Sequence, residues 1–137
     1  MSENHPFAGW ELDTGFDPFE DHNGPIYRKR DENGGYRCGF VAERRHCNGM
    51  QAVHGAMYLL LADYALFAIA RDRMQDQFGV TVSLNADFTA AASEGDVVLA
   101  SGEVIHETGK MLFVRGTIYT DKATVLGFSG IIRRVRV

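Results

Sequence analysis

The chain has 137 residues and a formal net charge of −4, with 14 Lys and Arg against 18 Asp and Glu. This length is typical of one domain and is sufficient to bury a hydrophobic core. Hydrophobic residues make up 45% of the chain and charged residues 23%, a composition that excludes an intrinsically disordered chain. The acidic balance argues against a nucleic-acid binder and leaves room for a local basic pocket that takes an anionic ligand.

Residues 1–25 are expected to form an irregular extension with one helical turn near residues 17–22, and residues 26–137 a single domain. The N-terminus lacks the basic and apolar stretches of a secretory signal. Cys38 and Cys47 are too few for a disulfide framework and do not match a zinc-binding spacing. These features predict a cytoplasmic protein with free thiols.

Six strands are expected, and one of them, residues 80–88, alternates apolar and polar side chains. Its expected apolar face consists of Val80, Val82, Leu84, Ala86 and Phe88. Turn residues bound the other expected strands, which are residues 26–30, 36–43, 97–105, 111–120 and 124–137.

A long apolar helix is predicted from His54 to about Gln77, with Gly79 as its stop signal, after a polar loop at residues 44–53. Its apolar run is shorter than the roughly 20 residues that span a bilayer, and Asp63 lies at its middle. A helix this apolar needs cover on most sides. We therefore predict an α+β fold in which a curved antiparallel sheet of five to six strands wraps a long central helix.

Asp63 is the first candidate functional residue. An unpaired buried carboxylate is costly, so a carboxylate in an apolar helix is paired, neutralised or functional. The structural interpretation is a carboxylate capped by a hydroxyl group or an arginine. The sequence leaves both interpretations open.

The helix begins with His54-Gly55-Ala56. The first N–H groups of a helix have no intrahelical partner, and the helix dipole adds partial positive charge there. A glycine lets a ligand approach the backbone closely. These residues fit an anion or oxyanion site, and they fit a plain helix N-terminus equally well.

The spacing between these two candidates carries a further prediction. Gly55 and Asp63 are eight residues apart, which is about 12 Å along a helix, so one carbonyl group cannot contact both. Two such helices packed antiparallel about a two-fold axis near Leu59 would place Asp63 of one chain beside Gly55 of the other. If both residues serve one reaction, the protein is a dimer with two sites at its interface.

The order Asn48, His54-Gly55 and Leu61-Ala62-Asp63 is similar to the signature of hotdog-fold acyl-CoA thioesterases, specifically the PaaI-like branch of the phenylacetate pathway. Further resemblance lies in residues 79–85, 95–96 and 109–113, and the likeness extends over residues 24–137. Two departures, Gln51 and Ala56, stand where the family usually has glycine. The resemblance implies the hotdog fold.

The resemblance also implies an activity, the hydrolysis of an acyl-CoA thioester to a free acid and coenzyme A. The Gly55 N–H would polarise the thioester carbonyl, and Asp63 of the partner chain would act as general base or as nucleophile. Thr81 would hold the water or Asp63, Asn48 would donate to the thioester or orient water, and His54 would shape the loop or hydrogen-bond near the thioester. No metal and no cofactor are implied, because coenzyme A enters as part of the substrate.

Coenzyme A carries several phosphates, so a basic rim is expected. Its candidates, each of which is also consistent with a solvated strand residue, are Lys110, Arg115, Arg133, Arg134 and Arg136. The acyl tunnel is expected to be lined by Met57, Leu60, Tyr64 and Phe88 or by their copies in the partner chain.

Two other functions stay open: a non-catalytic hotdog protein that binds acyl-CoA or an aromatic ligand, and an acyl-thioester hydratase. The hydratase is disfavoured because no Asp accompanies His46 or His54 in the loop before the helix. The expected partners are acyl-CoA and further copies of this chain, as a homodimer or a homotetramer built from two dimers. Neither nucleic acid nor a membrane is expected as a partner.

Overall fold

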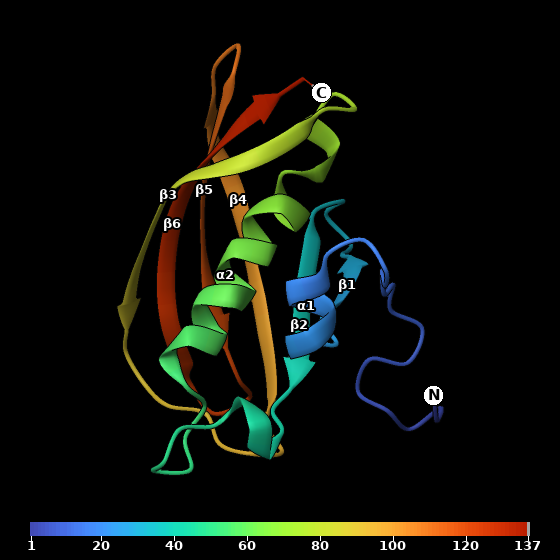
Figure 1. The fold of residues 1–137 in the computed structure, drawn as a ribbon, viewed down its shortest axis with the longest axis vertical. Coiled ribbons are helices and arrows are strands. Elements are labelled where there is room, and N and C mark those ends of the chain that lie inside the picture. Colours follow the sequence, from blue (N-terminus) through green and yellow to red (C-terminus); the bar gives the residue numbers. More distant parts are fainter. Residues whose placement is uncertain (137) are drawn as a thin grey trace.

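The computed structural model describes residues 1–136, in which a six-stranded antiparallel sheet curves around one long helix, α2 (Gly55–Ile69) (Figure 1). The strands are β1 (Tyr27–Arg30), β2 (Tyr36–Val41), β3 (Phe78–Phe88), β4 (Val97–Glu107), β5 (Met111–Tyr119) and β6 (Thr124–Val135). Their order in the sheet is β1-β2-β4-β5-β6-β3. This architecture confirms the predicted α+β fold.

The hydrophobic core lies between α2 and the concave face of the sheet. Leu61, Ala62, Ala65 and Leu66 of the helix are fully buried. They pack against alternating inward-facing residues of the strands, including Val98, Leu112, Val114, Ile118, Leu126 and Ile132. The helix is apolar on most sides because the curved sheet covers most of them. No helix among residues 1–136 is long and apolar enough to cross a membrane.

The predicted C-terminal end of the helix is wrong: α2 ends at Ile69, not near Gln77. After Ala70 the apolar sequence gives way to the charged 3-10 turn η2 (Arg71–Arg73). Gln75 and Asp76 then both adopt φ of 57°, in the left-handed region, which is incompatible with a continuing helix. The chain therefore reverses into β3 earlier than the sequence pattern predicts.

Gly79 is also not a stop signal but a residue within β3. A Cβ atom there would lie 2.7–2.9 Å from side-chain atoms of Met74, Ile132 and Phe67. The position therefore needs glycine for close packing. The strand ends within residues 1–136 lie within two residues of the prediction, and the predicted last strand residue, Val137, lies outside the described residues.

The expected single apolar face of β3 is interrupted by a β-bulge between Thr81 and Ser83. Thr81 pairs with Ile132, whose side chain is fully buried against α2. Beyond the bulge Leu84 pairs with Gly130, where a Cβ atom would meet Leu66 of α2. Inward-facing positions are thus odd-numbered before the bulge and even-numbered after it. Val80 consequently does not share the inner face with Leu84, and it is half-exposed.

A short helix, α1 (Pro18–Asn23), precedes β1 and confirms the expected helical turn. Asp17 caps it by accepting a 3.0 Å hydrogen bond from the Glu20 N–H. In Figure 1, α1 lies on the viewer's side of β2, next to α2. A second 3-10 turn, η1 (Arg44–His46), follows β2 and leads into the loop before α2.

Candidate active site

Asp63 of α2 is half-buried, and the Thr81 hydroxyl of β3 donates a 2.5 Å hydrogen bond to its Oδ1. The carboxylate is therefore paired, as its position in an apolar helix requires. Its Oδ2 has no hydrogen-bond partner among residues 1–136. The bulge in β3 makes the pairing possible, because it allows Thr81 to face α2 while Leu84 also faces the core. Strand bulges commonly redirect side chains beside active sites.

The N-terminus of α2 leaves the Gly55 N–H without a partner among the described residues. His54 is the N-cap, and its Nδ1 accepts a 2.9 Å hydrogen bond from the Ala56 N–H. His54 therefore caps the first turn of α2 and supplies the Ala56 N–H with a hydrogen-bond partner. Gly55 faces Phe88, since a Cβ atom at Gly55 would lie 3.6 Å from Cε1 of that ring.

Asn48 lies in an exposed loop before α2, and its side chain organises that loop. Its Oδ1 accepts hydrogen bonds from the Met50 N–H at 2.9 Å and from the Ala52 N–H at 3.3 Å. Gln51 of this loop adopts φ of 66°, in the left-handed region. For a residue other than glycine this conformation costs about 1–2 kcal/mol.

The predicted site residues form two groups within one chain. Asn48, His54 and Gly55 gather at the N-terminal end of α2, whereas Asp63 and Thr81 lie two turns further along. Eight helical residues separate Gly55 from Asp63, about 12 Å. One chain therefore does not bring the two groups together.

The expected tunnel residues are distributed along α2 rather than clustered. Met57 is buried, Leu60 and Tyr64 are half-buried, and Phe88 is 53% exposed beside Gly55. Tyr64 points towards β1, where the Arg28 guanidinium donates to its hydroxyl at 3.5 Å. Burial raises the pKa of Tyr64 to about 12.

Two of the expected basic residues are engaged in structural contacts. Arg115 pairs with Glu103 at 2.8 Å, and its position alternates with those of Leu112 and Val114, which face the core. Arg115 therefore lies on the outer face of the sheet, away from α2. Arg134 is buried and binds Glu107 and the main-chain oxygens of η2 and of the β4–β5 turn.

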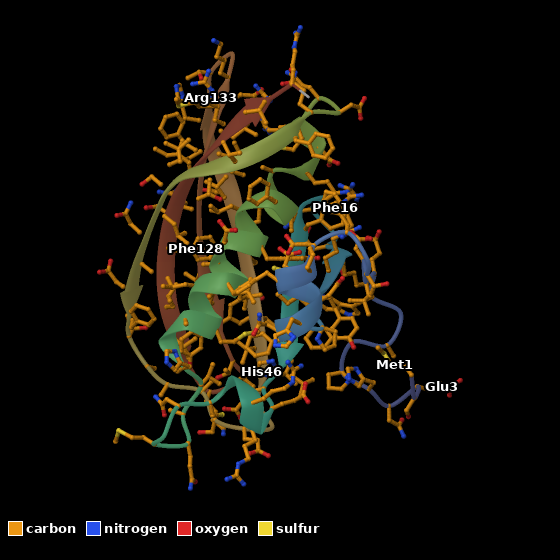
Figure 2. The ribbon with its side chains drawn as sticks, viewed as in Figure 1. Met1, Glu3, Phe16, His46, Phe128 and Arg133 are labelled. Atoms are coloured by element: carbon orange, nitrogen blue, oxygen red, sulfur yellow. The ribbon has the colours of Figure 1, made fainter. Side chains whose placement is uncertain are left out.

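The other three basic candidates are exposed, and they lie together at one end of the sheet. Lys110 occupies the β4–β5 turn, while Arg133 and Arg136 are exposed near the C-terminal end of β6. Figure 2 shows Arg133 near the end of the sheet that is remote from His46. The basic rim thus divides into the outward Arg115, the structural Arg134 and these three exposed cations.

Residues 1–136 offer little support for a metal site or for a reactive thiol. No three His, Cys, Asp or Glu side chains are grouped so as to hold a metal ion there. Cys38 is fully buried, and burial raises the pKa of its thiol, which opposes formation of the reactive thiolate. Cys47 is half-buried and directs its sulfur to the Glu43 carbonyl.

Residues 11–23, here called the N-terminal strap, make contacts with the domain that the sequence did not predict. Its Asp13 carboxylate pairs with the buried Arg28 guanidinium of β1. Its far end is held by His46, whose Nε2 donates to the Asn23 carbonyl at 2.6 Å while Nδ1 accepts from the Glu43 N–H at 3.0 Å. Figure 2 shows α1 between Phe16 and His46. No local pattern links these residues, because their partners lie far apart in the chain.

Comparisons with known proteins place this geometry in a family. The family model of the thioesterase superfamily matches residues 50–126, more than half of the chain. The Pseudomonas aeruginosa protein PA0474, whose name proposes an esterase, is 29% identical over 115 residues, covering 83% of this chain and 86% of that protein.

Solved structures share the fold. The E. coli PaaI protein from the phenylacetic acid degradation operon has a TM-score of 0.77 at 22% identity, with 88% of this chain and 86% of that chain covered. The Bacillus halodurans protein BH2602, solved with CoA, has a TM-score of 0.74 at 23% identity, with 80% and 74% covered. The chain therefore belongs to the thioesterase superfamily and has the hotdog-like fold of the PaaI proteins.

Proposed function

We propose that this protein is an acyl-CoA thioesterase that hydrolyses its substrate to a free acid and coenzyme A at sites shared between two chains. The observation that carries the proposal is the Asp63 carboxylate of α2, which accepts a hydrogen bond from Thr81 of β3. The N-terminus of the same helix presents the Gly55 N–H, which has no partner among the described residues. Two structural neighbours crystallised with coenzyme A support acyl-CoA as the substrate class.

The edge of β3 supports assembly into a dimer. Among the described residues β3 pairs only with β6, so its second edge has unpaired main-chain groups. Phe78, Val80 and Val82 on this strand are about half-exposed, and Leu59 of α2 is 39% exposed. An open apolar edge favours addition of another strand. Pairing β3 with its copy about a two-fold axis near Leu59 would bring Asp63 of one chain towards Gly55 of the other.

In the proposed reaction the Gly55 N–H donates to the thioester oxygen, which becomes negative as the carbonyl carbon is attacked. Asp63 of the partner chain either removes a proton from the attacking water or attacks the carbon directly, in which case water then hydrolyses the resulting anhydride. The carbon–sulfur bond breaks, and the proton taken from water reaches the departing thiolate. Thr81 orients Asp63, while Asn48 and His54 maintain the loop that presents Gly55.

The first test is release of free thiol from a panel of acyl-CoAs: phenylacetyl, hydroxybenzoyl, hexanoyl, lauroyl and palmitoyl. Asp63→Asn should lower kcat by at least roughly 10²-fold, because its amide is neither a base nor a nucleophile. The matched control is Asp87→Asn, which changes an exposed carboxylate on β3. Full activity in Asp63→Asn would remove Asp63 from the mechanism.

The wild-type result also separates the remaining functions. Binding of acyl-CoA without turnover would support the non-catalytic hotdog protein instead. A change in enoyl absorbance without thiol release would support the hydratase.

The shared site is tested by mixing two inactive variants, Asp63→Asn and Gly55→Pro. Heterodimers would contain one site with both residues intact, so part of the activity should return. Circular dichroism would verify that both variants fold, and co-purification of differently tagged variants would verify that subunits exchange. No recovery in verified heterodimers would refute a site built from two chains.

A further inference from the structure

The N-terminal strap brings an aromatic side chain, Phe16, to the edge of the sheet at which a second chain is proposed to pair. The Phe16 ring stacks on Phe78 at the start of β3, with ring centroids 6.3 Å apart and planes inclined by 16°. These two residues, here called the aromatic pair, remain 72% and 54% exposed. Val80 and Val82 of the same strand are also about half-exposed. Contiguous exposed apolar surface of this kind is typical of an interaction site.

The main chain on both sides of Phe16 is held in place. The Gly15 N–H donates to the Asp21 carboxylate at 2.8 Å, and Asp17 accepts a hydrogen bond of 3.0 Å from the Glu20 N–H as the N-cap of α1. The ring is therefore exposed but fixed in position. A side chain that is already ordered loses little conformational freedom on binding, so it is suited to contact a partner.

Contacts along β3 show where the aromatic pair lies relative to the candidate site. Thr81 binds Asp63 of α2, and Phe78 precedes Thr81 by three residues. Three steps along a strand cover about 10 Å. A Cβ atom at Gly79 would lie 2.9 Å from Phe67, which is one turn past Asp63. The aromatic pair therefore lies beyond Asp63, towards the C-terminal end of α2.

The contacts between α2 and β3 agree on the position of a two-fold axis. Asp63 lies beside Thr81, whereas Gly55 lies beside Phe88 near the other end of the same strand. An axis that exchanges Asp63 and Gly55 between antiparallel helices therefore also exchanges Thr81 and Phe88 between antiparallel copies of β3. Packing of the helices and pairing of the open strand edges thus require the same axis.

This axis determines which part of a second copy faces Phe16. Phe16 lies beyond Asp63 on its own chain, so it meets what lies beyond Gly55 on the other chain. Figure 1 shows that the loop before α2 extends past the N-terminal end of the helix. Met50 of this loop is 88% exposed. Methionine side chains adapt their shape and make favourable contacts with aromatic rings.

We propose that the aromatic pair of each chain is the docking surface for Met50 and the surrounding loop of a second copy. This inference rests on the proposed function, because that loop presents Gly55 to the Asp63 of the docking chain. The strap thereby completes each shared site, since Phe16 supports the partner's loop at the site to which its own chain contributes Asp63. Phe16 is a positioning residue, which contacts the loop and not the thioester.

A cross-linking test does not depend on turnover. Phe16 is replaced by photoreactive benzoylphenylalanine, and a mixture of ¹⁵N-labelled and unlabelled protein is irradiated, so that mass spectrometry distinguishes cross-links between chains. We expect position 16 to cross-link to the loop around Met50 of the other chain. Asn33, exposed in the β1–β2 turn at the opposite edge of the sheet, is the control position. Dimers in sedimentation without this cross-link would overturn the proposal.

The kinetic test uses heterodimers of Asp63→Asn and Gly55→Pro chains, in which the one intact site takes Asp63 from the Gly55→Pro chain. Phe16→Ala should fold, because the ring is largely exposed. Placed in the Gly55→Pro chain, it should lower the recovered kcat/KM roughly tenfold more than in the Asp63→Asn chain, whose strap lies at the inactive site. An equal loss whichever chain carries the change would overturn the proposal, because a merely structural role has no such asymmetry.

The two tests separate the docking surface from the proposed function. Dimers that cross-link as expected but release no thiol from any acyl-CoA would refute the proposed function and support the docking surface. Thiol release by dimers in which position 16 does not reach the other chain's loop would refute the docking surface alone. A monomeric wild type would refute both the shared site and the docking surface.

Discussion

Removing the Thr81 hydroxyl is the sharpest test of how Asp63 is held. Thr81→Val deletes the 2.5 Å hydrogen bond to Asp63 Oδ1 and keeps a β-branched side chain. A hydrogen bond to a charged group contributes about 1.5–3 kcal/mol. If the bond aligns the carboxylate for attack, its loss lowers kcat/KM by roughly 10- to 150-fold.

The fold should tolerate this change, because Thr81 is exposed and valine favours strands. We expect the free energy of unfolding to fall by at most about 1.5–3 kcal/mol, the contribution of the lost hydrogen bond. Thiol release measures kcat/KM, and thermal melting followed by circular dichroism verifies the fold. Thr81→Ser keeps the hydroxyl group and should stay within about threefold of the wild type. Thr81→Val with unaltered kcat/KM would show that the bond is structural only.

Two further predictions concern the other end of α2. Gly55→Ala should fold normally, since the added Cβ atom lies 3.6 Å from Phe88, but it should lower kcat/KM roughly 10- to 100-fold by displacing the thioester. Gly49→Ala is the control, because a Cβ atom there has nothing within 4 Å. Equal activity of both variants would refute close approach of the thioester to Gly55. Burial lowers the pKa of His46 below its ordinary 6.5, so the contribution of the neutral imidazole to stability is complete above pH 6.5 and declines below it. His46→Leu should lower the free energy of unfolding at pH 8 by about 1–3 kcal/mol for each group left unpaired, and it should flatten the decline at lower pH. An unchanged pH dependence of this free energy in chemical denaturation would contradict the assignment.

Sequence periodicity was sufficient to predict that the strands and the apolar helix exist. The places where the prediction was wrong have identifiable physical causes. After α2 ends at Ile69, the chain passes through η2 and through left-handed conformations at Gln75 and Asp76, residue types that carry no stop signal. Alternation in β3 likewise predicted one apolar face, and the bulge between Thr81 and Ser83 divides it.

The candidate site shows the same division between local and distant information. The spacing of Gly55 and Asp63 along the helix could be worked out from the sequence, and the structure keeps them two turns apart. Because 18 residues separate Asp63 from Thr81, no local pattern predicts their contact. The family resemblance alone suggested it. The contacts of Arg28 with Asp13 and Tyr64 join three separate segments, so no local pattern could predict them.

His46 has a consequence for how the molecule opens locally. Its ring joins the Asn23 carbonyl to the Glu43 N–H, and its main-chain oxygen accepts the His54 N–H at 2.8 Å. One residue thus connects the end of α1 to the start of α2. Amide hydrogens that depend on the same contacts exchange in cooperative units. The amides of Glu43 and His54 should therefore exchange with solvent at matched rates, so that the first 23 residues and the loop presenting Gly55 behave as one folding unit.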